Sequence, residues 1–462
     1  MKHWFFTVYY LRVPHTPSAP KLNVLCKPLL VFAVLFVHGE LAVAQLEFEG
    51  APINYQSAPV SDPVATLQQK LDRGEAALKW DEKHGWLPSV LEQLSVPQSS
   101  QLLVFSKTSL QLRRIMPSRP RALYFNDETY IGWVQRGDVV EVSTVDPRQG
   151  AIFYTLKQQI TDSPKFVRDR GQCLICHASS RTKGVPGHLV RSVYPSRDGQ
   201  PHFGLGTITT DHSTPFEKRF GGWYVTGTHG EMRHLGNAIA DDNRKDPIDP
   251  GPGANLESLS RLVRTTPYLQ PTSDLVALMV LEHQSQMHNL ITRASFETRR
   301  AKHHDAVMNA ALKRSVDSVS ESTGRRIASA AEKLVEYLLF ADEFRLTSPV
   351  AGVSDFAEEF SIGGPRDSKG RTLRDFDLQT RLFRHPCSFL IYSEAFDAMP
   401  EPMLDAVYSR LFAVLDRAVE SSSEEDVFSH LSVADRTAIR EILAETKPEF
   451  RVRHAAVSKR IR

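Results

Sequence analysis

Cys173, Cys176 and His177 form a C-x-x-C-H motif within the stretch GQCLICHASS. This spacing is the one used for covalent attachment of haem. The two thiols form thioether bonds with the haem vinyl groups, and the adjacent histidine binds the iron. The chain holds no second C-x-x-C-H. The sequence therefore predicts one covalent haem, attached through Cys173 and Cys176 and ligated by His177.

Two other chemistries use paired cysteines. A structural zinc site needs four ligands, often from a second closely spaced pair, but neither Cys26 nor Cys387 has a neighbouring cysteine. A thioredoxin-like redox pair expects a strand and a helix around C-x-x-C, whereas the charged stretch before Cys173 is typical of a loop. Covalent haem is therefore the favoured interpretation. We expect Cys387 to be buried as a small apolar residue.

Residues 1–44 resemble a signal peptide, and the long aromatic stretch before Lys27 is more typical of a misplaced translation start than of part of that signal. Lys27 precedes an apolar run at 29–37, and Ala42-Val43-Ala44 forms a small-x-small cleavage pattern before Gln45. The run is shorter than the about 20 apolar residues that a membrane span needs. We therefore predict export and no stable membrane span after cleavage, with an uncleaved anchor as the alternative.

The type of secondary structure that the sequence predicts changes along the chain, and these elements must position the motif. We predict an α+β fold, with a small antiparallel sheet region around the haem and a mostly helical C-terminal half. The expected parts are a helical segment at 45–100, a mixed β haem-binding region at 101–245, a linker at 246–272 and a helical region at 273–462. Ser273 and Asp274 are suitable caps for the first long helix of that last region.

Composition excludes some functions. The 462 residues include 56 basic and 54 acidic side chains, a net charge of +2. Such a balance creates no strong field for nucleic acid, so we expect no nucleic-acid partner. The hydrophobic content of 41% is sufficient for real cores. The oligomeric state is not specified by the sequence.

The residue opposite His177 decides how the iron is used. A methionine or histidine there fills the remaining coordination position of the iron and favours electron transfer. An open coordination position allows oxygen or peroxide chemistry. We expect His229, because the bulky strand before it would hold its side chain in place. The candidates are His229, Met232, His234, His283 and Met287.

The motif after a signal peptide resembles c-type cytochromes. The flanking sequence is similar to one subset of them, the large exported single-haem proteins described as cytochrome c domain-containing. The similar stretches are 119–134, 173–193, 221–237, 278–294 and 385–400. The resemblance implies haem c at Cys173, Cys176 and His177, and it implies attachment outside the cytoplasmic membrane, in the periplasm or another extracytoplasmic compartment. It implies no particular substrate.

These features predict an exported mono-haem c-type cytochrome that transfers single electrons to or from a redox protein partner. One alternative is a peroxidase-like haem enzyme with an open iron position lined by His229, His234 or Arg233. A second alternative is a haem-based sensor. A helical half of this size is more than a simple electron carrier needs, and the sequence does not indicate its role.

Overall fold

The computed structural model describes residues 46–241, 247–417 and 426–461. Short runs rich in β-branched and aromatic residues form a seven-stranded antiparallel sheet with the order β6-β5-β4-β3-β2-β1-β9. A separate antiparallel pair joins β7 to β8. The strands are β1 (Leu102–Val104), β2 (Arg121–Phe125), β3 (Thr129–Trp133), β4 (Val139–Asp146), β5 (Gly150–Lys157), β6 (Phe166–Arg168), β7 (Val190–Val193), β8 (Thr207–Thr210) and β9 (Trp223–Tyr224).

The register of the sheet aligns side chains that matter for the site. Phe125, Tyr130, Ser143 and Phe153 are direct neighbours across β2, β3, β4 and β5. Directly paired residues project from the same face of a sheet. These four side chains therefore form one row, which we call the aromatic row.

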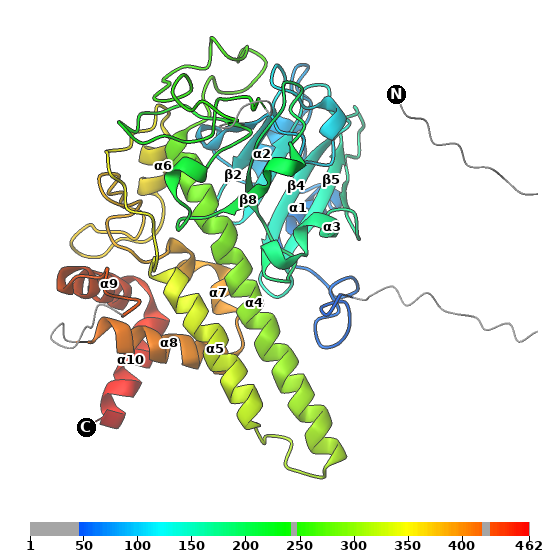
Figure 1. Ribbon diagram of the computed structural model, residues 1–462. Coiled ribbons are helices and arrows are strands. Elements are labelled where there is room, and N and C mark those ends of the chain that lie inside the picture. The colour runs from blue at the N-terminus through cyan, green and yellow to red at the C-terminus, as the bar shows by residue number, and fades with distance from the viewer. Residues whose placement is uncertain (1–45, 242–246, 418–425, 462) are drawn as a thin grey trace, which may run out of the picture. The chain divides into compact units, whose positions relative to one another are not determined.

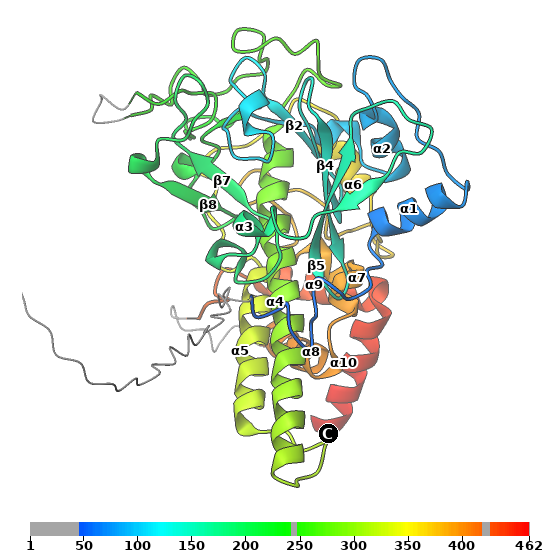
Figure 2. The same ribbon diagram turned by 90° about the vertical axis from the view of Figure 1, so that its right-hand side faces the viewer.

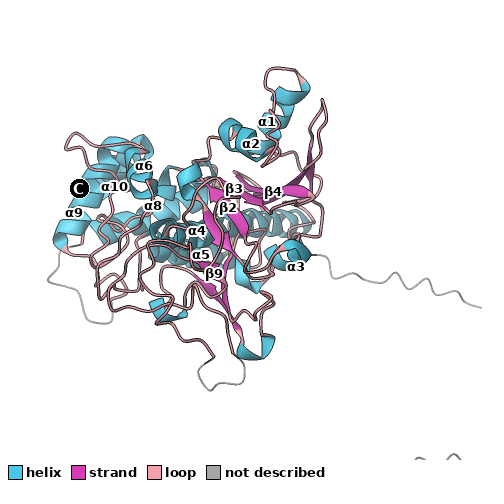
Figure 3. Ribbon diagram, turned by 90° about the horizontal axis from the view of Figure 1, so that it is seen from above, coloured by secondary structure: helices cyan, strands magenta, loops and turns pink. Residues whose placement is uncertain are grey.

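Helices cover both faces of the sheet. The helices α1 (Pro63–Asp72) and α2 (Leu87–Gln93) share one apolar core with the sheet. The long helix α4 (Leu275–Ala311) shares a second core with the other face. Figure 3 shows α1 and α2 on one side of the strands and α4 with α5 on the other.

Helix α4 joins the sheet to the helical half, as Figures 1 and 2 show. It begins as the sequence predicts, because the Asp274 side chain accepts hydrogen bonds from the backbone N–H groups of Val276 and Ala277. Ser273 does not cap it and instead bonds to the backbone of Leu103 and Tyr224. The first half of α4 is buried on nearly all sides.

The remaining helices lie mostly in the C-terminal half of the chain. They are α3 (Leu174–His177), α5 (Glu321–Leu338), α6 (Phe356–Ile362), α7 (Glu394–Asp397), α8 (Glu401–Leu415), α9 (Val433–Thr446) and α10 (Pro448–Ile461). Short 3-10 helices lie at Gln98–Ser100, Leu112–Arg114, Ser180–Thr182, Phe203–Leu205, Phe216–Lys218 and Phe389–Tyr392. The predicted α+β architecture, with its sheet in the N-terminal half and helices in the C-terminal half, is confirmed.

The segment expected to link two domains behaves differently from a linker. Residues 247–272 contain no helix or strand, but Leu259, Val263 and Tyr268 are buried in the core that α1 and α2 share with the sheet. The described residues from Leu46 onward accordingly fall within one compact unit. The predicted signal peptide, 1–44, lies outside the described residues. Among the described helices, none combines the length and apolar character that crossing a bilayer requires.

Candidate haem-attachment site

The C-x-x-C-H motif occupies a single helical turn after β6. Cys173 precedes the first residue of α3, and its carbonyl accepts the backbone N–H of Cys176 at 3.2 Å and that of His177 at 2.9 Å. The Asp169 carboxylate accepts the backbone N–H of Cys173 at 2.9 Å. Two cysteines and a histidine are thereby held on one turn, the arrangement that attachment to one haem requires.

His177 is held in the tautomer that binds iron. Its Nδ1 lies 2.9 Å from the backbone carbonyl oxygen of Gly187. A carbonyl only accepts, so Nδ1 carries the proton and the Nε2 lone pair is free. Burial lowers the pKa of His177, which keeps the ring neutral. No described residue makes a hydrogen bond to Nε2.

The two thiols are free and differ in environment. Cys173 is half-buried and Cys176 is exposed. Burial, together with the nearby Asp169 carboxylate, raises the pKa of Cys173 to about 12. A thioredoxin-like pair needs a lowered thiol pKa, so this environment counts against that alternative.

The zinc alternative lacks a ligand set in the described part of the chain. No group of three or more His, Cys, Asp or Glu side chains is placed there to hold a metal ion. Cys387 is fully buried, as predicted, and burial raises the pKa of its thiol. Cys26 lies outside the described residues.

An ion pair on the sheet lies beside the motif. Arg121 of β2 reaches across Gly132 of β3 and places Nη2 2.8 Å from Oε2 of Glu141 on β4. A Cβ at position 132 would lie 2.2 Å from that guanidinium nitrogen, so only glycine leaves room. The charges of Arg121 and Glu141 act on the pKa values of both His177 and Cys173.

Arg121 also carries an unsatisfied donor. Its Nε is buried and has no hydrogen-bond partner, and a buried donor without a partner costs about 1–3 kcal/mol. A carboxylate of a haem attached at the motif would satisfy it. The residues present therefore fit a haem, with His177 as iron ligand and Arg121 as a carboxylate partner.

His188 supports the segment that holds His177. Its Nε2 lies 2.6 Å from the Ser143 hydroxyl, and its ring lies 4.2 Å from that of Tyr130. The Asn289 side chain of α4 accepts the His188 backbone N–H at 2.8 Å and donates to its carbonyl at 2.7 Å. These bonds fix the position of Gly187 and therefore of the carbonyl that orients His177.

The contact between the aromatic row and the motif is made by Phe153, whose ring centroid lies 4.9 Å from that of His177. Sequence reasoning did not identify Arg121, Glu141, Gly187 or His188. Their roles depend on strand register and on a backbone carbonyl, and neither leaves a signal in residue spacing.

His229, the predicted second iron ligand, has no free ring nitrogen. Its Nδ1 lies 2.7 Å from the carbonyl oxygen of Met232, and its Nε2 accepts the backbone N–H of Asn255 at 3.1 Å. The carbonyl fixes the proton on Nδ1, so Nε2 uses its only lone pair on Asn255. To bind iron, His229 would have to give up that bond. We therefore do not propose it as the second ligand.

The other four candidates are also engaged elsewhere. His283 contacts His212 Nδ1 and the Ser388 hydroxyl, each at 2.8 Å. His234 accepts the backbone N–H of Gly236. Met232 and Met287 belong to the core shared with α4, whereas Leu174 of the motif belongs to the core shared with α1 and α2. None of the contacts described for the five candidates involves Cys173, Cys176 or His177.

If a haem were attached at the motif, the neutral His177 would serve its metal and Arg121 its carboxylates. Arg233, predicted as a charge stabiliser near the iron, instead donates to the carbonyls of Gly230 and Met232.

Comparisons with protein-family models, with curated proteins and with solved structures found no match to this chain.

Proposed function

We propose that this protein carries one covalent haem through Cys173 and Cys176, with His177 as iron ligand, and transfers single electrons to or from a redox protein partner. The observation that supports it best is the hydrogen bond from His177 Nδ1 to Gly187. This bond selects the tautomer, fixes the ring and raises its basicity, as supporting contacts do for metal-bound histidines.

When bound, the haem supplies an iron that accepts and releases one electron. The chain orients the haem and leaves it accessible to a partner. Cys176 is exposed, and the neighbouring Ile175 is 79% exposed, so the motif lies at the surface. Figure 2 shows α3 beside β7 and β5 rather than inside the helical half. A surface position suits both attachment of haem and contact with a partner.

A second candidate function is favoured by the same site. None of the contacts described for the five expected ligands involves the motif, and Arg121 presents an unpaired donor beside it. An open iron position with a half-buried arginine nearby would allow a small anionic or peroxide ligand to bind. This is the haem enzyme alternative, with Arg121 in place of Arg233; in it, Arg121 Nε would bind the iron's small ligand rather than a haem carboxylate.

One spectroscopic experiment separates the two functions. The full chain is produced with a c-type maturation system and export, and ferric and ferrous spectra are recorded with and without carbon monoxide. A low-spin iron that does not bind carbon monoxide supports the electron carrier. A high-spin iron that binds it supports the enzyme. Absence of any attached haem contradicts both the electron carrier and the enzyme. Export of the chain is part of the same proposal.

A further inference from the structure

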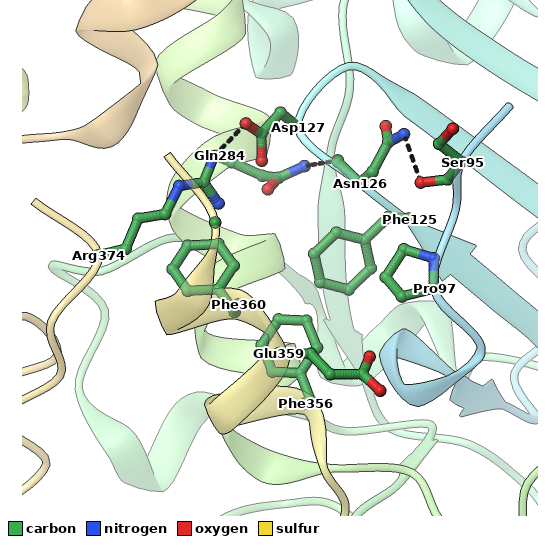
Figure 4. Close-up of a pocket in the computed structure, with 11 residues that line it drawn as sticks. Ser95, Pro97, Phe125, Asn126, Asp127, Gln284, Phe356, Glu359, Phe360 and Arg374 are labelled. Carbon is green, nitrogen blue, oxygen red and sulfur yellow. Dashed lines mark hydrogen bonds and ion pairs between the residues drawn. The ribbon is translucent and has the colours of Figure 1, made fainter. Parts of the chain in front are cut away.

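A pocket of about 260 Å³ lies away from the motif, between the β2–β3 turn and α6. Phe125 at its edge begins the aromatic row, which ends at Phe153 beside His177. Phe356 and Phe360 of α6 form the apolar side of the pocket. Figure 4 shows these rings on one side and the polar ends of Asp127, Gln284 and Asn126 along the other.

The apolar side is aromatic and fixed. The ring centroids of Phe125 and Phe356 lie 5.6 Å apart, as do those of Phe356 and Phe360. The Arg374 guanidinium lies 4.5 Å from the Phe360 ring and forms an ion pair with Asp127. Fixed aromatic rings at such spacings favour an aromatic guest over a flexible aliphatic one.

Beside the Arg374–Asp127 ion pair, the polar side presents hydrogen-bond acceptors. Gln284 Nε2 donates to the Asn126 carbonyl and to the Tyr130 hydroxyl, each at 2.9 Å. The carbonyl fixes the orientation of the amide, and the buried Gln284 Oε1 is left without a donor. The Asn126 amide is itself engaged with the Leu94 carbonyl at 3.0 Å. Glu359 adds a carboxylate at the opposite edge.

We infer that this pocket binds a small molecule with one aromatic ring that carries hydroxyl or amine hydrogen-bond donors. The ring packs against the phenylalanines, and its donor satisfies Gln284 Oε1 or the Asp127 carboxylate. The volume is below the about 300–1,000 Å³ usual for drug-sized ligands, which limits the guest to a single ring. This site needs no haem, so it goes beyond the proposed function.

Isothermal titration of the full chain tests the inference with 4-methylphenol as the probe. Its methyl ether, 4-methylanisole, has the same ring without a donor and serves as the ligand control. We expect 4-methylphenol to bind at least about tenfold more tightly than the ether, a ratio of about 1.4 kcal/mol. Equal affinities, or no binding of the phenol, overturn the inference.

A blocking variant locates the site. Gly363 lines the pocket with negative φ, and a Cβ there would lie 3.8 Å from the Arg374 side chain. Gly363→Leu therefore fills the mouth without backbone strain, and we expect it to weaken binding at least about tenfold. Gly324→Leu, on the open surface of α5, is the matched control and keeps wild-type affinity. Unchanged binding to Gly363→Leu overturns the assignment.

The same titration on chain produced without haem maturation separates this inference from the proposed function. If the phenol binds to this sample and the matured sample carries no haem, the inference about the pocket is supported and the proposed electron transfer is contradicted. If haem is attached but the phenol does not bind, only the inference about the pocket is contradicted.

Discussion

Gly187→Ala tests whether the segment behind His177 is as tightly built as the structure indicates. A Cβ at position 187 would lie 2.1 Å from Asn289 Oδ1 and 3.1 Å from the Thr182 Cβ. Gly187 does not have a positive φ, so the alanine backbone itself is unstrained. The methyl group therefore acts by pushing the Asn289 amide away from His188.

The cost follows from the bonds that this displacement breaks. Asn289 makes two buried hydrogen bonds to the His188 backbone, at 2.8 and 2.7 Å. Each is worth about 1 kcal/mol, with a further penalty for backbone groups left unsatisfied. We expect Gly187→Ala to lower the free energy of unfolding by about 2–4 kcal/mol.

Urea denaturation of the full chain measures the change, with Gly171→Ala as the matched control. Gly171 precedes the motif, has nothing within 4 Å of an added Cβ and lacks a positive φ, so its variant should retain wild-type stability. In haem-loaded protein, Gly187→Ala should also raise the reduction potential, because a weaker bond to Nδ1 makes His177 less basic. A stability loss below about 0.5 kcal/mol would refute the steric argument.

Two further predictions concern charged groups. Burial raises the pKa of Glu282 to about 7, although Arg219, 3.2 Å away, lowers it. At pH 8 the wild-type carboxylate is mostly charged and paired, so Arg219→Met must either leave it buried and unpaired or force it to take up a proton, and the variant should lose about 3–5 kcal/mol of stability. At pH 5 Glu282 is protonated with or without Arg219, so the loss should be clearly smaller. Urea unfolding at both pH values tests this, and a loss independent of pH contradicts it. Asp169→Asn removes a charge that raises the pKa of Cys173, so the haem-free chain should react faster with a thiol reagent at pH 8; an unchanged rate contradicts that reasoning.

The sequence was sufficient where local chemistry decides structure. Short runs rich in β-branched and aromatic residues, separated by turn signals, predicted the antiparallel sheet region. Asp274 predicted the start of α4 because a cap is a contact between near neighbours in sequence. The motif was recognisable for the same reason, since three reactive residues within five positions share one turn. The mixed architecture follows from these local signals.

Contacts between residues far apart in the chain could not be predicted from the sequence. The first half of α4, which contains His283, is buried nearly all round, so helical periodicity cannot separate a core face from a surface face there. His229 was expected to bind the iron because the strand before it would hold its side chain in place, yet a backbone N–H from Asn255, 26 residues away, takes its lone pair. Arg121 and Glu141 meet only because β3 places a glycine between them.

The most direct test of the central claim is the mass of the peptide that contains Cys173 and Cys176, measured after export with c-type maturation, denaturation and proteolysis. The account predicts that this peptide carries the added mass of one haem, and that replacing both cysteines with alanine leaves no haem on the chain. A peptide of unmodified mass, or haem that stays covalently attached in the double variant, would contradict the account.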